Sequence, residues 1–343
     1  MPSLAQPLSV YCYGMPSDVG GANTELWHTL KLWRSLGIGV TMVTQIPPPS
    51  YKWQRRVEGI GCKLSATLVP GGSIVVGFCN SAFRHDAPML HAAGCKLVYA
   101  PCMCYPLPEE RRSLLADRYV FQSEFQRSKL MPRLRRHGLA EEHGVLIRGA
   151  FDMAEFPFRP LPHTPAESFI VGRLSRAYGE PGHVPALDKY PRDLWTQYGA
   201  ITYDPLRARV MGWSMEIERH CGKPPEWAEV LPQGAESSQE FLAKIHCLVP
   251  GVGCCAENWP RIGLEAMAAG VPIVAEEKGG WMEMLGEVPP ISTVTEQSDE
   301  VNRLACDERA RGYMLACQLE RVGMLADADV IGEQWIELFE GLQ

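Results

Sequence analysis

Short apolar runs alternate with stretches of helical periodicity along most of this chain. Residues 8–14 (LSVYCYG) predict a buried strand, and residues 22–36 predict a helix because their apolar side chains recur at helical spacing. Gly37 suits the position just after that helix. Residues 40–44 predict the next strand, and this strand–helix–strand order indicates a parallel sheet covered by helices.

The same alternation continues on both sides of a proline-rich break. Residues 157–166 (PFRPLPHTPA) contain four prolines, a density that excludes regular structure and marks a linker. Before this break, strands are predicted at 73–78, 96–100, 119–122 and 145–148, with helices at 87–93 and 123–136. After it, strands are predicted at 169–171, 208–211, 246–249 and 271–275 with helices between them, a long loop at 174–192, and helices at 298–341.

The pattern therefore predicts an α/β protein with two halves of the same kind. A length of 343 residues suits two domains of ~150 residues each. We assign residues 1–156 to an N-terminal Rossmann-like domain, 157–166 to the linker and 167–300 to a C-terminal Rossmann-like domain. Residues 301–343 are predicted to be helices that cross back to the N-terminal domain.

The charge distribution narrows the classes of partner. The net charge of −7 argues against non-specific nucleic-acid binding, which depends on neutralising phosphates. Residues 111–148 nevertheless hold nine bases against four acids, and Arg127–His137 contains no acid. This basic run is either a solvated helix face or a surface for an anionic acceptor or a membrane.

The start of the chain lacks the pattern of a signal peptide, and no run of about 18 apolar residues is present, so we expect a cytoplasmic protein that could also lie peripherally on a membrane. Neither Cys102-x-Cys104 nor Cys254-Cys255 has a second Cys or His pair at zinc-finger spacing. We therefore predict no metal site.

Several residues stand where parallel sheets bind ligands. Gly20 and Gly21 follow the first predicted strand and begin its helix, whose N-terminal N–H groups suit a phosphate. Arg173 directly follows the strand segment Phe169–Gly172, where an arginine can bind a diphosphate through two hydrogen bonds. Each of these signals is weak alone, because a turn or a surface arginine explains it equally well.

The stretch from Cys255 to Glu283 (CAENWPRIGLEAMAAGVPIVAEEKGGWME) is the most informative segment. Glu257 and Glu265 are separated by seven residues, and a helix that starts at Pro260 and stops at Gly270 lies between loop and strand. Two carboxylates can accept hydrogen bonds from sugar or ribose hydroxyls at two points of one ligand. The pair Gly279 and Gly280 would let a sugar or phosphate approach the main chain.

Four stretches in this order resemble the retaining glycosyltransferases of family 4. They are GGANTELWHTL from Gly20, VLIRGAFDMAEF from Val145, FIVGRLSR from Phe169 and ENWPRIGLEAMAAGVPIVAEEKGGWME from Glu257. The resemblance covers about residues 8–285 and depends on the combination of the four. It implies the GT-B fold, in which two Rossmann-like domains face each other across a cleft.

The resemblance also implies a reaction and a donor site. The reaction would move a hexose from a nucleoside-diphosphate sugar to an acceptor hydroxyl, with retention of configuration and without a metal ion. Arg173 would hold the diphosphate, Glu265 the ribose, and Glu257 the donor sugar near its reacting face. The lysine that partners the arginine in this family would be Lys189 if residues 177–187 are an insertion.

The resemblance assigns further residues to the borders of the donor. Gly279, Gly280 and Glu283 would border the sugar and phosphates, and Gly20 and Gly21 would approach the diphosphate from the other domain. Many relatives carry a histidine on a loop of the N-terminal domain, but the corresponding YAPCMCYPLPEE has none. His85, on the loop after a preceding strand, is the candidate to replace it; a surface histidine is the plainer interpretation.

The sequence leaves the acceptor and some rival functions open. The acceptor could be a glycan, a lipid-linked molecule, a small molecule or a modified nucleic acid. A phage-type transferase acting on hydroxylated DNA bases would use Arg127–His137 as its groove, although the net charge of −7 argues against it. A sugar-nucleotide epimerase, a phosphorylase and an inactive binder of sugar nucleotides are further functions compatible with this fold.

Overall fold

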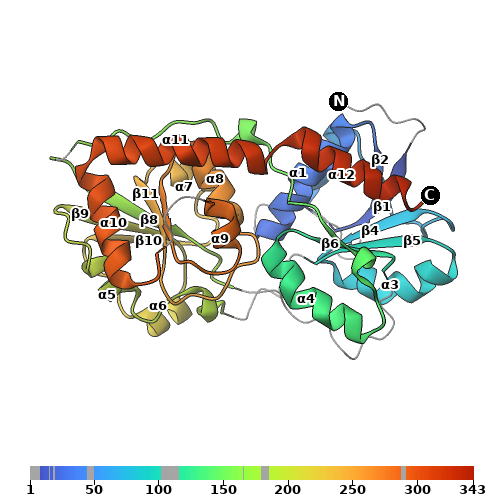
Figure 1. Cartoon of the computed structure of the whole chain (residues 1–343), viewed down its shortest axis with the longest axis horizontal. Helices are drawn as coiled ribbons and strands as arrows, with labels where there is room; N and C mark the ends of the chain where they lie inside the picture. Colours follow the sequence, from blue (N-terminus) through green and yellow to red (C-terminus); the bar gives the residue numbers. More distant parts are fainter. Residues whose placement is uncertain are drawn as a thin grey trace. The chain divides into compact units, whose positions relative to one another are not determined.

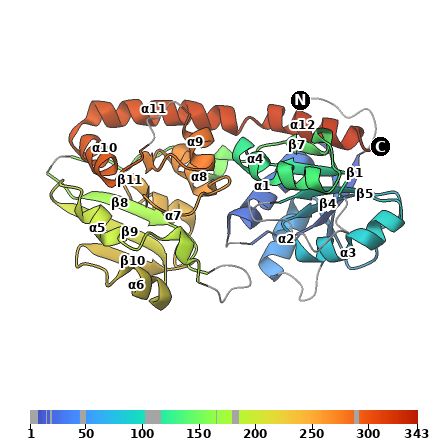
Figure 2. The same cartoon turned by 60° about the horizontal axis from the view of Figure 1, so that its bottom comes forward.

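The computed structural model divides the chain into two compact units. The first comprises Met1–Phe151 and Ala326–Gln343, and the second comprises Asp152–Leu325. Each unit is an α/β structure in which helices cover a sheet (Figures 1 and 2). The residues that the structure describes are 8–14, 16–17, 20–44, 50–101, 116–164, 166–178, 185–286 and 291–343.

A parallel sheet forms the centre of the first unit. Over the described residues it has seven strands in the order β3-β2-β1-β4-β5-β6-β7, so the strand order reverses between β1 and β4. Val10 of β1 pairs with Val40 of β2 on one side and with Ile74 of β4 on the other. The strands are β1 (Ser9–Tyr13), β2 (Gly39–Val43), β3 (Lys63–Ser65), β4 (Ile74–Phe78), β5 (Lys96–Ala100), β6 (Arg118–Phe121) and β7 (Gly144–Leu146).

Helices from both ends of the chain cover this sheet. The C-terminal helix lies beside the first helix, as both views show. Trp33 of the first helix and Trp335 of the last are both buried, and their ring centres are 5.0 Å apart. The helices are α1 (Gly21–Ser35), α2 (Tyr51–Gly59), α3 (Ser81–Ala92), α4 (Glu124–Arg136) and α12 (Ala328–Glu340).

Trp335→Ala is expected to destabilise the first unit by about 3–5 kcal/mol, because the large ring leaves a cavity between α12 and α1. Val330→Ala is the control on the same helix, since Val330 is 51% exposed. The control is expected to change the free energy of unfolding by less than about 0.5 kcal/mol. Urea unfolding followed by circular dichroism measures both, and equal losses would show that α12 is not anchored through Trp335.

The second unit is built on a smaller parallel sheet. Over the described residues it has five strands in the order β10-β9-β8-β11-β12, which reverses between β8 and β11. Gly172 of β8 pairs with Arg209 of β9 and with Leu248 of β11. The strands are β8 (Phe169–Leu174), β9 (Leu206–Trp213), β10 (Ala228–Pro232), β11 (Cys247–Gly251) and β12 (Ile273–Ala275).

The helices of the second unit follow from strong local signals. Between Pro260 and Gly270, α8 starts after a proline and stops at a glycine whose φ is 80°, a left-handed conformation that a side chain would disfavour. A long helix, α11, lies against α8 (Figures 1 and 2). The helices are α5 (Leu194–Gly199), α6 (Met215–Cys221), α7 (Ser238–Leu242), α8 (Arg261–Ala269), α9 (Gly280–Leu285), α10 (Val294–Cys306) and α11 (Glu308–Leu325).

The predicted α/β architecture with two parallel sheets is confirmed, and three elements escape the hydrophobic pattern. The strands β3 and β10 lie at sheet edges, and none of their residues is buried. In α2 only Trp53 and Val57 are buried. The helix predicted at 87–93 begins earlier, at Ser81, because the Asn80 side chain accepts a hydrogen bond from the N–H of Phe83.

Candidate functional site

The carboxyl ends of β8 and β11 define the candidate site in the second unit. The strand order reverses between these two strands, and open parallel sheets bind ligands outside the carboxyl ends at such a point. Arg173 lies near the end of β8, and residues 252–257 follow β11. The N–H of Gly253 donates to Oε2 of Glu276 at 2.9 Å, which ties the segment after β11 to the segment after β12.

Arg173 is a buried cation with unused hydrogen-bond donors. It is 4% exposed, and its Nη2 donates to the main-chain oxygen of Lys189 and contacts Sγ of Cys254 at 3.8 Å. Its guanidinium lies 4.6 Å from the centre of the Tyr190 ring. Nε and Nη1 have no hydrogen-bond partner among the described residues. A buried charge is costly without an anion, so this geometry fits an anionic ligand.

The structure brings Lys189 and Glu257 to Arg173. After β8, Tyr178 and Pro185 form an antiparallel bridge, and Lys189 follows in a short 3-10 helix. Nζ of Lys189 forms an ion pair with the carboxylate of Glu257. These side chains are 16% and 35% exposed, so both remain accessible to a ligand. Three predicted donor residues therefore lie at one edge of the sheet.

Glu265 is a buried carboxylate in α8, 6% exposed. Burial raises the pKa of its carboxyl to about 6, while Arg261 and a hydrogen bond from Ser238 counteract this shift and Glu155 adds to it. A carboxyl with this pKa is mostly ionised at neutral pH and can accept hydrogen bonds from hydroxyl groups. Its charge state thus suits the predicted contact with a ribose.

Gly279 and Gly280 let two segments of the site approach each other. The N–H of Gly280 donates to the main-chain oxygen of Glu257 at 2.8 Å. A Cβ atom on Gly280 would lie 1.9 Å from the main-chain oxygen of Asn258, and one on Gly279 would lie 2.5 Å from that of Glu257. Internal packing therefore requires both glycines, and it fixes the main chain at Glu257. Contact with a sugar or phosphate stays a prediction for them.

Two charged residues flank these glycines. Nζ of Lys278 donates to the main-chain oxygen of Cys254 at 2.5 Å and lies 4.0 Å from Oε1 of Glu276. Glu283 is half-buried in α9, and its main-chain oxygen accepts a hydrogen bond from Arg321. Lys278 thus adds a positive charge beside the Arg173 region, whereas the predicted role of Glu283 has no further structural support.

In the first unit, Gly20 and Gly21 lie where the strand order reverses. They begin α1, the helix that follows β1, and β1 and β4 are the two strands at the reversal. Gly20 has a φ of 92°, a conformation that favours glycine, and its oxygen accepts hydrogen bonds from the N–H groups of Asn23 and Thr24. The geometry leaves the predicted contact with a diphosphate open.

His85 lies within α3, which corrects the expectation that it stands on a loop. The helix starts at Ser81 because of its Asn80 cap, so FRHDAP is helical. The His85 side chain is 87% exposed, and its Nδ1 lies 2.9 Å from Oδ1 of Asp86. Oδ2 of Asp86 accepts a hydrogen bond from the Tyr13 hydroxyl at 3.0 Å. This links His85 to the end of β1.

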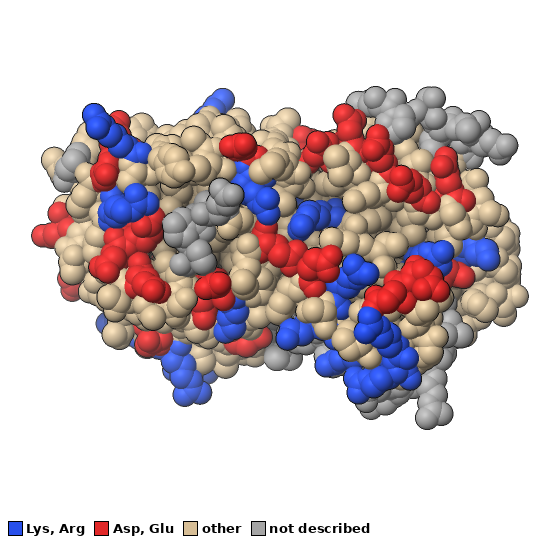
Figure 3. Space-filling model, in the orientation of Figure 1, with Lys and Arg blue, Asp and Glu red and all other residues tan. Residues whose placement is uncertain are grey.

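The basic run forms the exposed side of α4. Figure 3 shows Lys and Arg side chains gathered on the surface over this helix. Part of this charge is compensated, because Arg127 and Arg135 both pair with Glu141. No helix in the described part of the chain is long and apolar enough to cross a membrane.

The structure leaves the metal prediction untested. Among the described residues, no three His, Cys, Asp or Glu side chains are grouped as a metal site would require. Cys102 and Cys104 lie outside the described residues.

The N–H of Cys255 donates to the main-chain oxygen of Asp188 at 2.8 Å, which holds the segment carrying Lys189 beside the segment carrying Glu257.

Sequence reasoning missed Ser238, Lys278 and Asp86. Lys278 directly precedes the glycine pair, so its position was a usable signal. Asp86 is the neighbour of His85 and could have been recognised as its partner. No sequence signal connects Ser238 with Glu265, because they come from different helices.

Comparison with known proteins finds solved structures with the same architecture. No protein-family model matches the sequence, and no curated protein matches it either. HepE from Anabaena, solved with UDP and glucose, superimposes with a TM-score of 0.72 at 16% identity, covering 97% of this chain and 99% of that one. Its complex with UDP-glucose gives 0.71 at 15% identity, with coverage of 97% and 100%.

A glycosyltransferase from Rickettsia africae ESF-5 gives a similar result. Its TM-score is 0.70 at 10% identity, with 98% of each chain covered. At these identities the similarity shows the fold alone. The two parallel sheets with their helices share the GT-B fold of such glycosyltransferases, which confirms the predicted fold class.

Proposed function

We propose that this protein is a glycosyltransferase that uses a nucleoside-diphosphate sugar as its donor. The observation that carries the proposal is Arg173, a buried guanidinium whose Nε and Nη1 have no partner among the described residues. It lies at the reversal of strand order in a GT-B fold. A diphosphate would supply the missing acceptors, and the ionised Glu265 would accept hydrogen bonds from the ribose.

The structural neighbours support a uridine donor. HepE was solved with UDP and with UDP-glucose, and a further neighbour is a galactosyltransferase, WaaB. We therefore propose UDP-hexose as the donor class. The acceptor carries a hydroxyl group, and the exposed bases of α4 are the candidate surface if that acceptor is anionic.

The site suggests how the sugar would leave its donor. Negative charge develops on the leaving diphosphate, and Arg173 together with Lys189 would stabilise it without a metal ion. Glu257, which pairs with Lys189, would exchange this ion pair for contacts with the donor sugar. Retention of configuration is proposed from the resemblance to family 4 enzymes. A cytoplasmic location is likewise part of the proposal.

Thermal unfolding against UDP, GDP, ADP, CDP, dTDP and NAD tests the proposal. UDP at a hundredfold excess over its dissociation constant is expected to stabilise the protein by about 2.7 kcal/mol. The shift is expected to vanish in Glu265→Ala, which removes the ribose acceptor. It is expected to persist in Arg207→Ala, because Arg207 is exposed near the amino end of β9, away from the carboxyl edge.

The remaining outcomes each point to a different conclusion. A shift with another diphosphate would keep the transferase and change the donor. A shift with NAD alone, or with no nucleotide, would overturn the site assignment and leave the fold. Binding of UDP-sugars without turnover, with all acceptor classes supplied, would favour the inactive binder.

A further inference from the structure

Two tryptophan rings hold an arginine between the first two helices of the first unit. Trp27 of α1 and Trp53 of α2 are both buried, and their ring centres lie 5.6 Å apart at an interplanar angle of 72°. The guanidinium carbon of Arg56, on α2, lies 4.4 Å from the centre of the Trp27 ring and 4.1 Å from that of the Trp53 ring. Aromatic faces attract cations, so two rings together restrict where this guanidinium lies.

Arg56 contacts these rings but no carboxylate. Among the residues that the structure describes, its side chain forms no hydrogen bond and no ion pair. The acids of α1 and α2 are Glu25 and Glu58. Glu25 accepts a hydrogen bond from Gln122, and Glu58 is exposed and forms no ion pair within the described part of the chain. The N–H groups of the Arg56 guanidinium therefore remain available to a ligand.

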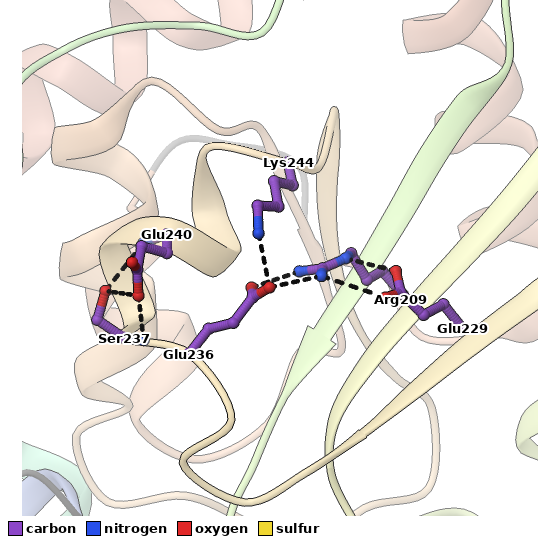
Figure 4. Close-up of polar contacts among 6 residues, drawn as sticks. All are labelled: Arg209, Glu229, Glu236, Ser237, Glu240 and Lys244. Carbon is purple, nitrogen blue, oxygen red and sulfur yellow. Dashed lines mark hydrogen bonds and ion pairs between the residues drawn. The ribbon is translucent and has the colours of Figure 1, made fainter.

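Arg209 of the second unit shows how this chain pairs a buried arginine that has a structural role. Its guanidinium donates to Glu229 at 2.7 and 3.4 Å and to Glu236 at 2.7 and 2.8 Å (Figure 4). These carboxylates compensate its charge and satisfy its donors within the protein. Arg56 is partly buried and has no such partner.

The junction of α1 and α2 has a polar link of its own. Nε of Arg34, on α1, donates to the main-chain oxygen of Ile60, directly after α2, at 3.3 Å. The rings of Trp27 and Trp53 add the apolar contact between the two helices. Holding the helices together therefore does not require the hydrogen-bonding groups of Arg56.

Two lysines add positive charge around the same pair of rings. Nζ of Lys31 lies 5.9 Å from the centre of the Trp27 ring, and Nζ of Lys52 lies 6.0 Å from that of the Trp53 ring. Together with Arg56 they form a group of three cations on α1 and α2. Such a local excess of positive charge attracts an anion even though the whole chain carries a net charge of −7.

We propose that Arg56, with Lys31 and Lys52 beside it, is a binding site for a phosphate group. A guanidinium forms two parallel hydrogen bonds to phosphate oxygens, and a phosphate monoester carries up to two negative charges, which suits three cations better than a carboxylate does. Because the guanidinium already lies against two rings, little side-chain freedom is lost on binding. The site belongs to the first unit, whereas Arg173 and the candidate donor site belong to the second.

Titration with glycerol phosphate at pH 8 and constant ionic strength tests the site. The Arg173→Met protein is used, because it no longer offers the donor-site arginine to a phosphate. Binding is expected to change tryptophan fluorescence, since Trp27 and Trp53 both contact Arg56. Arg56→Gln in this background is expected to raise the dissociation constant at least about tenfold, the size of one lost hydrogen bond between charged groups.

Arg55→Gln is the matched control, because it removes one positive charge from the same helix. Arg55 is exposed and donates to the Tyr51 hydroxyl at 2.7 Å, so its loss is expected to change the dissociation constant less than about twofold. Thermal unfolding checks that both variants fold. Equal effects of the two substitutions would show a general effect of charge and would overturn the assignment to Arg56.

Arg56→Lys separates geometry from charge. It keeps the positive charge, but an ammonium cannot form the two parallel hydrogen bonds, so binding of glycerol phosphate is expected to weaken severalfold. Should Arg56→Gln not fold, Arg56→Lys carries the comparison with Arg55→Gln. Full affinity in Arg56→Lys would contradict recognition through the guanidinium.

Vesicles distinguish the sources of the phosphate group. Phosphatidic acid in phosphatidylcholine vesicles presents the same phosphate monoester at a lipid surface, and sedimentation measures binding. Vesicle binding that Arg56→Gln loses and Arg55→Gln keeps would assign the site to a lipid headgroup. Binding of glycerol phosphate without sedimentation would assign it to a soluble phosphate ester, and binding of neither probe would overturn the proposal.

The inference does not rest on the proposed function. A protein that binds glycerol phosphate through Arg56 but binds no nucleotide would keep this site and lose the donor site. A protein that binds UDP, and whose Arg173→Met variant binds neither phosphate probe, would keep the proposed function and lose this inference.

Discussion

Arg173→Met is expected to abolish binding of the nucleoside diphosphate while leaving the free energy of unfolding unchanged or higher. Arg173 is buried, and two of its nitrogens have no partner among the described residues. Burying this incompletely paired charge lowers the stability of the folded chain, and an uncharged methionine would not have this effect. Methionine can also pack on the Tyr190 ring, where the guanidinium now lies. Loss of the diphosphate contact is expected to lower kcat/KM by about 10²–10³.

Arg209→Met is the matched control for stability. Arg209 also lies buried, on the neighbouring strand, but Glu229 and Glu236 pair with it. Its loss leaves carboxylates without their cation and is expected to destabilise the protein by about 3 kcal/mol. Urea unfolding of both variants measures how much each arginine contributes to the free energy of unfolding. An equal loss of stability in Arg173→Met would make Arg173 a structural residue, and retained nucleotide binding would remove it from the donor site.

The fold was predictable where strands are buried on both faces. The strand β4 shows all five of its residues buried, and the run Ile74–Phe78 is continuously apolar, so the sequence marks it clearly. The edge strand β10 has no buried residue and carries Glu229, so its apolar stretch is too short to mark it. The helix α8 was predicted almost to the residue because Pro260 and Gly270 act through the local backbone.

The site was predictable only as far as its signals are local. Arg173 and Glu265 stand out through the elements that carry them, a strand end and a helix between proline and glycine. The ion pair between Lys189 and Glu257 spans 68 residues of sequence, so no local pattern around the lysine marks its partner. The influence of Ser238 on the pKa of Glu265 depends on how α7 and α8 pack together, which the tertiary structure alone decides.

Glu265→Gln is expected to remove a pH dependence from both stability and donor binding. Burial raises the pKa of the native carboxyl to about 6, against an ordinary value of 4.5. Between these two values the folded chain holds a proton that the unfolded chain has lost, so stability falls as the pH rises through this window. Above pH 6 this loss of stability is complete and amounts to about 2 kcal/mol. Glu265→Gln is therefore expected to be more stable than wild type at pH 8 by up to this amount, and equal at pH 4.

Donor binding is expected to respond in the opposite direction. The ionised carboxylate accepts the ribose hydroxyls, so the affinity of the wild-type protein should weaken as the pH falls through about 6. Glu265→Gln should bind the donor about 100-fold more weakly than wild type at pH 8, and its affinity should not change with pH in this range. Titration with a nucleotide sugar between pH 5 and 8 measures this, because its diphosphate has no proton that titrates there. A ribose held elsewhere would give the two proteins the same affinity at pH 8. The combination of higher stability with weaker binding is what distinguishes a carboxylate kept for a ligand from one kept for the fold.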